Sequence, residues 1–165
     1  VSEGHVRRWG GAMRLRLLDG APVRVWDTRA PKRTRGGGGA VVDAARARAG
    51  GLAVRQVGAG LDEGGGLLAC SRMDGAPLPS VRAAQDKAFT ALLGLPTEGL
   101  SAAVTAVPGL NEVMAGMERI TLLGDGAPLL VEGRLVGAVG VGGGTPAQDV
   151  QCAQAGCAAL ERARG

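Results

Sequence analysis

The balance of glycine and aromatic residues limits what this chain can fold into. Its 165 residues include 30 glycines but only three aromatic side chains, Trp9, Trp26 and Phe89, and no tyrosine. A hydrophobic content of 45% indicates a folded chain, and this length is typical of one domain with a single core. The core must therefore consist of Ala, Val and Leu, with elements packed closely over small side chains. Because small side chains bury little apolar area, we expect further burial in a homo-oligomer.

Positive charge is concentrated at the beginning of the chain. Residues 1–36 contain nine Lys and Arg against three acidic residues, a net charge of +6, whereas residues 37–165 carry a net charge of −2. We therefore predict a basic N-terminal extension over residues 1–36 and a nearly neutral folded domain over residues 37–165. Since the domain itself is not basic, the high pI is no evidence for nucleic-acid binding, and we expect no nucleic-acid partner.

Two alternatives stay open for the extension. Residues 15–18 and 23–26 could form a β-hairpin by the turn chemistry of Asp19-Gly20, although the loop Asp19–Pro22 is too long for a tight turn. The composition of the whole segment favours the other alternative, a disordered extension or one without a structural purpose. The run Gly36–Gly39, which follows the basic residues, is predicted to be a flexible linker.

The cysteines and the hydropathy pattern exclude several classes of protein. Cys70, Cys152 and Cys157 form no CxxC pair, and the last two would not share one face of a helix. Zinc-ligand spacings are also missing, so we predict free thiols, no metal site and a cytoplasmic protein. No apolar run of about 18 residues occurs, and we expect no association with a membrane.

The periodicity of apolar residues predicts an α+β fold. The clearest start of a helix has Thr145 as N-cap, Pro146 at the first helical position and Gln148 at the third, which is the pattern of a capping box. Predicted helices cover residues 40–49, 81–93, a short segment from Thr97 and residues 145–163; predicted strands cover residues 52–61, 67–72, 119–123, 128–131 and 134–142. Short connections between the strands favour a five-stranded antiparallel sheet flanked by helices.

Two motifs about 50 residues apart carry a family resemblance. The first is Ser71-Arg72-Met73-Asp74-Gly75-Ala76-Pro77 with Ala84-Gln85-Asp86-Lys87-Ala88-Phe89-Thr90-Ala91 after it. The second is Gly133-Arg134-Leu135-Val136-Gly137-Ala138-Val139-Gly140-Val141 with Gly142-Gly143-Gly144-Thr145-Pro146-Ala147-Gln148-Asp149. In this order they resemble the GlcG/HbpS-like family, the haem-degrading domain group, from about Gly39 to Ala159. The resemblance implies a profilin-like five-stranded sheet, a tendency to oligomerise and a connection with haem.

The matching motifs give seven candidate ligand-binding residues, whose spacing allows them to converge at one edge of the sheet: Arg72, Asp74, Lys87, Thr90, Gly143, Gly144 and Asp149. Lys87 lies beside the apolar face of its predicted helix, where a lysine must reach outward or find a carboxylate. One interpretation is a structural ion pair of Lys87 with Asp74 or Asp149. The other is that Lys87 and Arg72 present positive charge to an anionic ligand.

The glycines before the last helix also have two interpretations. Exposed amides of Gly143 and Gly144 at a helix N-terminus can bind an anion. Alternatively, glycine is required there because strand and helix pack backbone to backbone, or because φ is positive. The run has neither the P-loop pattern nor the dinucleotide-binding pattern.

The residue types that hold haem iron are scarce. Iron is usually held by His, Cys, Met or Tyr, and the single histidine, His5, lies in the predicted extension. Within the domain the remaining candidates are Met73, Met114, Met117 and Cys70, residue types that more often pack in a core than bind iron. Haem as a cofactor could also bind at an oligomer interface through apolar contacts, with Arg or Lys against its propionates. Without a histidine in the domain, Ser-His and Cys-His catalysis is not available.

We therefore predict an oligomeric small-ligand-binding protein of the GlcG/HbpS-like type, with haem or another small anionic compound as its ligand. The alternative is an enzyme, or an accessory subunit, that acts on a small organic acid or cofactor. In that case Lys87 would serve as an acid/base or electrostatic group.

Overall fold

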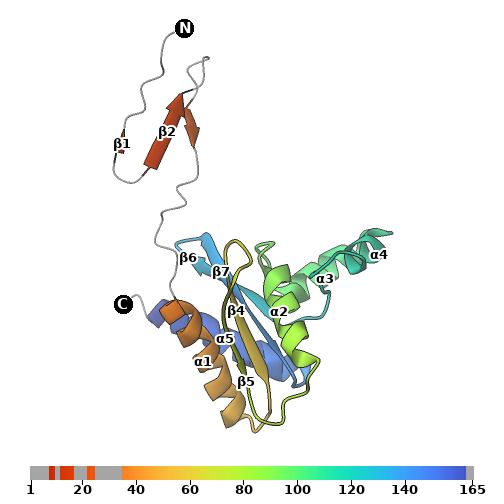
Figure 1. Cartoon of the computed structure of the whole chain (residues 1–165). Coiled ribbons are helices and arrows are strands. Elements are labelled where there is room, and N and C mark those ends of the chain that lie inside the picture. Colours follow the sequence, from red (N-terminus) through yellow and green to blue (C-terminus); the bar gives the residue numbers. More distant parts are fainter. Residues whose placement is uncertain (1–7, 10–11, 17–21, 25–34, 163–165) are drawn as a thin grey trace. The chain divides into compact units, whose positions relative to one another are not determined.

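The structure is a computed structural model that describes residues 8–9, 12–16, 22–24 and 35–162 (Figure 1). The chain divides into two compact units, Val1–Lys32 and Arg33–Gly165. In the first unit, β1 (Arg8–Trp9), β2 (Ala12–Arg16) and β3 (Pro22–Arg24) form an antiparallel sheet in the order β1-β2-β3. Leu15 pairs with Val23, as the hairpin alternative predicts. The rest of the predicted extension before Arg35 lies outside the described residues.

The second unit contains a four-stranded antiparallel sheet in the order β5-β4-β7-β6. Its strands are β4 (Val57–Asp62), β5 (Leu67–Arg72), β6 (Gly126–Val131) and β7 (Arg134–Gly142). The predicted α+β class, an antiparallel sheet flanked by helices, is confirmed. The predicted number of five strands is wrong.

The missing strand is the one predicted over residues 119–123. Arg119 has a φ of 64°, which bends the backbone away from an extended path. The N–H of Thr121 donates to Thr90 Oγ1 at 2.9 Å, and the N–H of Leu123 donates to Thr121 Oγ1 at 3.2 Å. Since side chains accept these backbone hydrogen bonds, the segment forms an irregular connection and not a strand of the sheet.

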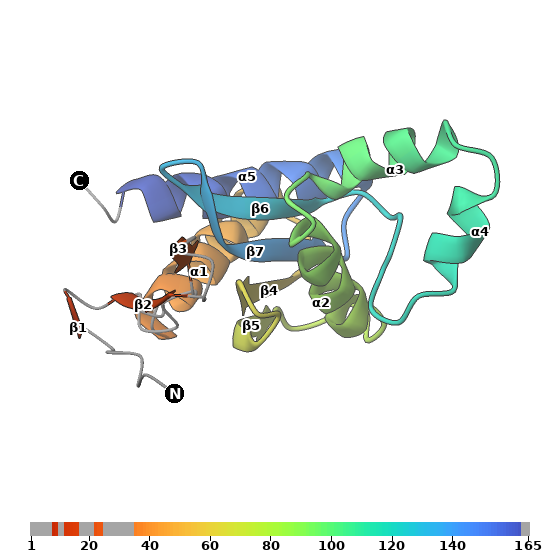
Figure 2. The ribbon, with the colours of Figure 1, turned by 90° about the horizontal axis from the view of Figure 1, so that it is seen from above.

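Helices cover both faces of the sheet (Figure 1). α1 (Arg35–Gly51) and α5 (Pro146–Arg162) pack against each other on one face, and α2 (Ser80–Ala91) lies on the other. α3 (Thr97–Thr105) and α4 (Leu110–Ala115) follow α2, and Figure 2 shows α3 near the start of α5. Within the described residues, none of the helices is long and apolar enough to cross a membrane.

Alternation along β7 sorts side chains by size between the two faces. Val139 and Val141 belong to the main core cluster with residues of α1 and α5. Ala138 packs in a smaller cluster with residues of α2. The larger side chains therefore fill the space beneath two helices, and the smaller ones allow α2 to approach the sheet.

Two paired glycines make this close approach feasible. Gly126 of β6 and Gly140 of β7 are cross-strand partners. A Cβ atom at Gly140 would overlap the carbonyl oxygen of Ala84, and one at Gly126 would overlap that of Lys87. Both carbonyls belong to α2, so glycine at these positions allows the helix backbone to lie directly on the strands.

The first helix begins earlier than its sequence pattern predicts. Gly36–Gly39 form part of α1, so the predicted flexible linker at these residues is wrong. A Cβ at Gly38 would lie 2.7 Å from the Cβ of Leu68 on β5. Close packing against the sheet therefore favours glycine here and outweighs its low helix propensity.

The strand predicted from residue 52 begins at Val57 instead, because the chain first completes the end of α1. Ala53 has a φ of 54°, and the N–H of Val54 donates to the carbonyl of Ala49 at 3.1 Å. This left-handed turn is a common helix ending, although glycine is more usual at its centre.

Candidate functional site

A buried cluster of three charged side chains lies between α2 and the start of α5. The Nζ of Lys87 lies 2.9 Å from Asp125 Oδ2 and 3.3 Å from Asp149 Oδ2. The exposed fractions are 5% for Lys87, 6% for Asp125 and 3% for Asp149. We refer to Lys87, Asp125 and Asp149 as the ion cluster. With all three groups ionised it carries a net charge of −1, because one ammonium faces two carboxylates.

Asp149 is held by donors from two other segments. Its Oδ1 accepts hydrogen bonds from Gln56 Nε2 at 2.5 Å and from the N–H of Gly144 at 2.9 Å. A Cβ at Gly144 would lie 2.7 Å from Gln56 Nε2, so glycine leaves room for this arrangement. The anion at this helix N-terminus is therefore the chain's own carboxylate.

Asp125 has an unusual backbone conformation for a residue with a side chain. Its φ is 87°, a region that few residues other than glycine adopt. The following N–H, of Gly126, donates to Thr97 Oγ1 at 2.8 Å, and the N–H of Val141 donates to the carbonyl of Asp125 at 3.4 Å. Contacts from the start of α3 and from β7 thus hold Asp125 in place.

The surroundings of Asp125 shift the pKa of its carboxyl upward. Burial raises the pKa of the Asp125 carboxyl, and the charges of Asp149 and Glu98 raise it further. The hydrogen bond and positive charge of Lys87 oppose the shift, and the net direction is upward.

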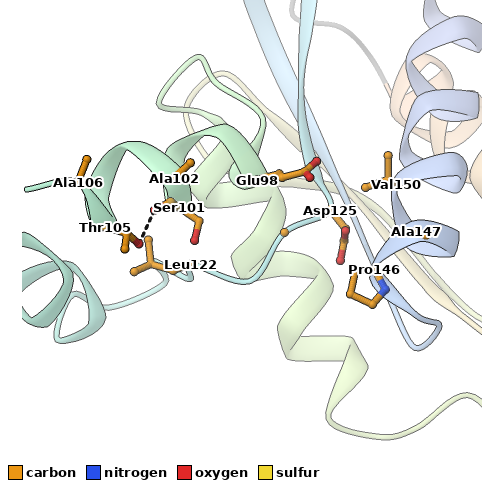
Figure 3. Close-up of a pocket in the computed structure, with 11 residues that line it drawn as sticks. Glu98, Ser101, Ala102, Thr105, Ala106, Leu122, Asp125, Pro146, Ala147 and Val150 are labelled. Carbon is orange, nitrogen blue, oxygen red and sulfur yellow. Dashed lines mark hydrogen bonds between the residues drawn. The ribbon is translucent and has the colours of Figure 1, made fainter.

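A cavity of about 1000 Å³ opens between α3, the segment before β6 and the first turns of α5 (Figure 3). Its lining consists of Glu98, Ser101, Ala102, Thr105, Ala106, Leu122, Gly124, Asp125, Pro146, Ala147 and Val150. Asp125 belongs both to this lining and to the ion cluster. It is therefore the residue through which a molecule in the cavity could contact the buried charges.

The lining is mainly apolar, and its ionisable groups are acidic. Glu98 and Asp125 are its two carboxylates, and it includes no Lys or Arg. In Figure 3 the side chains of Glu98 and Asp125 lie in the space between α3 and α5. This arrangement can surround a small apolar molecule and present negative charge to one end of it.

The structure brings together three of the seven predicted site residues, namely Lys87, Asp149 and Gly144. The predicted ion pair of Lys87 with Asp149 is confirmed, and among the described residues the second carboxylate paired with Lys87 is Asp125 and not the alternative partner Asp74. Gly143 is the neighbour of Gly144 and has a φ of 123°, which agrees with the interpretation that glycine is needed for conformation.

The other predicted residues lie apart from the ion cluster. The guanidinium of Arg72 donates to the carbonyl of Ala76 at 3.1 and 2.7 Å. Asp74 is exposed, and its carbonyl accepts a hydrogen bond from Arg55 Nη1 at 2.6 Å. Thr90 is fully buried and accepts the hydrogen bond that holds the segment before β6. None of the seven predicted residues lines the cavity.

Sequence reasoning missed Asp125, Gln56 and the α3 side of the cavity. The Gly124-Asp125-Gly126 pattern predicts a turn, but it does not indicate that Asp125 pairs with Lys87. In residues 35–162 and the short N-terminal strands, no group of three or more His, Cys, Asp or Glu is placed to hold a metal ion.

Comparisons with known proteins identify relatives of this chain. The family described as haem degrading protein HbpS-like matches residues 39–158. A 15.0 kDa protein from the dhaT-dhaS intergenic region of Citrobacter freundii is 37% identical over 91 residues, 54% of this chain. The chain spans 64% of that relative's length.

Two solved structures show the similarity in three dimensions. The complex of PduOC with haem is 32% identical, with a TM-score of 0.69, over 73% of this chain and 89% of that one. A double mutant of HbpS from Streptomyces reticuli is 29% identical, with a TM-score of 0.73, over 85% of this chain and 97% of that one. With the family match over residues 39–158, these similarities show that the chain belongs to the haem degrading HbpS-like family.

Proposed function

We propose that this chain is a haem-related small-ligand-binding protein, and that its ligand binds in the cavity between α3 and α5. The observation that carries the proposal is a cavity of about 1000 Å³ whose lining includes Asp125. Asp125 is the one member of the buried ion cluster in that lining. A mainly apolar lining with a few fixed polar groups is typical of small-molecule sites. The family and the haem complex of PduOC support a haem-related ligand.

The described residues do not fit haem through iron coordination in this cavity. The lining contains no His, Cys, Met or Tyr, the usual iron ligands. Among candidates elsewhere, Met73 Sδ accepts a hydrogen bond from the N–H of Gln56 at 3.5 Å, and Cys70 lies on the edge strand β5. His5 lies outside the described residues. Apolar contacts with the macrocycle are therefore the interaction that the cavity offers.

The charge of the lining also limits how such a ligand is oriented. Carboxylates of Glu98 and Asp125 repel the propionates of a tetrapyrrole. Propionates would therefore point to solvent, with the macrocycle against Ala102, Leu122 and Val150. We propose that the ligand is held by its apolar surface, with no contribution from iron.

We further propose that the chain forms a homo-oligomer. Large apolar side chains around α2, α4 and the segment before β6 are exposed, among them Leu78 at 72%, Val113 at 60% and Leu123 at 63%. Self-association would remove such side chains from water. Sedimentation velocity of the purified full chain measures its oligomeric state directly. A monomer at all concentrations would contradict the proposed homo-oligomer.

The test compares haemin with iron-free protoporphyrin IX. We expect both to bind the full chain with dissociation constants within about threefold of each other, because iron makes no bond to the protein. The variant Ala102→Trp fills the cavity from α3, and we expect it to weaken both ligands by about tenfold or more. Ala103→Trp is the matched control, since Ala103 is exposed on the same helix and outside the lining.

Two results would contradict the proposal. Equal binding by the Ala102→Trp and Ala103→Trp variants would place the ligand outside this cavity. Haemin that binds far more tightly than protoporphyrin would reveal an iron ligand, and the His5→Ala variant would show whether His5 supplies it.

A further inference from the structure

We propose that a ligand entering the cavity between α3 and α5 causes Asp125 to take up a proton, so that the ligand binds more tightly at lower pH. The inference rests on the proposed function, because it concerns how the same site is regulated. It follows from the position of Asp125, which belongs both to the lining and to the ion cluster. It requires no ionisable group on the ligand.

The ion cluster contains one ammonium and two carboxylates, all nearly inaccessible to solvent. Lys87, Asp125 and Asp149 are 5%, 6% and 3% exposed. Because one ammonium balances one carboxylate, the fully ionised cluster buries an excess negative charge, which is costly. Uptake of one proton would bring its net charge to zero. The contacts of the two carboxylates decide which one takes that proton.

Asp149 is the better stabilised of the two anions. Its Oδ1 accepts hydrogen bonds from Gln56 Nε2 at 2.5 Å and from the N–H of Gly144 at 2.9 Å, while its Oδ2 faces Lys87 Nζ at 3.3 Å. It also lies in the first turn of α5, where the helix dipole favours negative charge. Because hydrogen bonds to a carboxylate favour its charged form, Asp149 is the one that keeps its charge.

Asp125 has fewer donors and more negative charge around it. Within the described part of the chain, its carboxylate accepts one hydrogen bond, from Lys87 Nζ at 2.9 Å. Burial raises the pKa of the Asp125 carboxyl most, and the charges of Asp149 on α5 and Glu98 on α3 raise it further, against the opposing effect of Lys87 on α2. Asp125 is therefore the member of the ion cluster that accepts a proton.

A ligand would strengthen this tendency by removing water from Asp125. In Figure 3 the side chain of Asp125 lies in the space between α3 and α5. An apolar molecule against Ala102, Leu122 and Val150 would occupy the cavity that the same carboxylate lines. Loss of water disfavours the charged form of a carboxyl group and raises its pKa, so the complex takes up a proton as it forms.

Acid pH should therefore favour the complex. Affinity is highest below the pKa of Asp125 in the free chain, where the carboxyl is protonated with and without the ligand. It falls as pH rises from that value to the higher pKa in the complex, and it is constant above. Protonation leaves Lys87 paired with Asp149, so the cluster keeps one ion pair throughout.

The test uses N-phenyl-1-naphthylamine, an apolar fluorescent probe that stays uncharged throughout the titration. Its affinity for the full chain is measured by fluorescence from about pH 5 to about pH 8. We expect the dissociation constant to be about fivefold lower at the acid end of this range than at the alkaline end. Because the probe itself does not titrate, a pH dependence must come from the protein.

Asp125→Asn is the informative variant, because it places a neutral side chain of nearly the same shape where the carboxyl titrates. We expect the probe to bind it equally well across the pH range, close to its affinity for the unmodified chain at acid pH. Asp43→Asn makes the same chemical change at a side chain of α1 that is 68% exposed and outside the lining. Its pH profile should match that of the unmodified chain.

Glu98→Gln tests the assignment to Asp125 while leaving the ion cluster unaltered. Glu98 is exposed, and its charge is one of those that raise the pKa of Asp125. Its removal should shift the fall in affinity to lower pH. If the pH dependence disappears instead, Glu98 is the titrating group and the assignment to Asp125 is wrong.

The outcomes separate this inference from the proposed function. Equal affinity at both ends of the pH range, or a dependence that persists in Asp125→Asn, would overturn proton uptake at Asp125 and leave the cavity as the ligand site. The inference also fails if the probe does not bind, or if Ala102→Trp does not weaken its binding. The proposed ligand site itself fails only if porphyrin binding is insensitive to Ala102→Trp.

Discussion

Lys87 and Asp125 form a buried ion pair that joins α2 to the lining of the cavity beside α3. Their side chains meet at 2.9 Å although the residues are 38 positions apart in the sequence. Asp149 shares the same ammonium from the start of α5, so three elements are tied together at one point.

Loss of the central ammonium should destabilise the fold strongly. In Lys87→Met, two carboxylates remain buried without their cation, and we expect the free energy of unfolding to fall by about 3–5 kcal/mol. Arg46→Met is the matched control, because the side chain of Arg46 is 57% exposed in its pair with Asp43. Its effect should stay below about 1 kcal/mol in urea unfolding, and equal losses in both variants would contradict the assignment.

Gly140→Ala should also destabilise the protein, because its methyl group would overlap the carbonyl of Ala84 on α2. We expect a loss of about 2 kcal/mol or more from displacement of the helix. Gly39→Ala on α1 has no atom within 4 Å of the added Cβ and should stabilise the chain by about 0.5–1 kcal/mol. Thermal denaturation of both variants measures these changes in stability. A Gly140→Ala variant as stable as the unmodified chain would show that α2 packs less closely on β7 than the structure indicates.

The raised pKa of Asp125 predicts a specific dependence of stability on pH. Above the ordinary value of 3.8 and up to the raised value, the folded state binds more protons at Asp125 than the unfolded state. The contribution of Asp125 to stability is therefore largest at low pH and is lost as pH rises through the raised value.

The variant Asp125→Asn removes this contribution while its amide oxygen can still accept a hydrogen bond from Lys87. In urea unfolding from about pH 4 to about pH 7, the stability of the unmodified chain relative to the variant should decrease as pH rises. If the difference in unfolding free energy between the two proteins stays constant or increases with pH, the fold does not raise the pKa of the Asp125 carboxyl.

The three cysteines should differ sharply in reactivity. Cys70 is exposed on β5, Cys157 is half-buried and Cys152 is buried. Burial, together with the charge of Asp149, raises the pKa of the Cys152 thiol, so little thiolate forms there. A thiol-reactive dye should label Cys70 first and Cys152 only on unfolding, and Cys70→Ser should remove the fast phase. A fast phase that survives this substitution would contradict the burial order.

Local signals in the sequence predicted the later part of the domain well. One of the two bonds of the predicted capping box at α5 is present, with the N–H of Thr145 donating to Gln148 Oε1 at 3.0 Å. The Thr145 hydroxyl donates to the same oxygen, and the N–H of Gln148 donates to the carbonyl of Thr145. Glu132 and Gly133, predicted to join two strands, have φ values of 52° and 74°, as a tight hairpin turn requires. In both places, adjacent residues determine the conformation.

Features that depend on distant contacts could not be predicted in this way. Gly38 is helical because α1 packs on Leu68, a residue 30 positions away. Residues 119–123 resemble a strand by composition, but the hydroxyl of Thr90 accepts their backbone hydrogen bond. Neither contact leaves a local pattern in the sequence.

Only part of the candidate site could be predicted, because the rest of it also depends on contacts between distant residues. Lys87 and Asp149 were recognised because Lys87 lies beside an apolar helix face and Asp149 in the first turn of a helix. Asp125 reaches them only because Gly126 and Gly140 pair beneath α2, which is a property of strand register. Arg72 belongs to the same motif as Lys87 but uses its guanidinium for the carbonyl of Ala76.

The most direct test maps protoporphyrin IX onto the full chain by backbone amide chemical shifts. Binding in the proposed cavity predicts that the largest changes occur at Ala102 and Thr105 on α3 and at Ala147 and Val150 on α5. Changes that cluster instead around Arg72 and the edge strand β5, with α3 unaffected, would contradict the cavity as the ligand site.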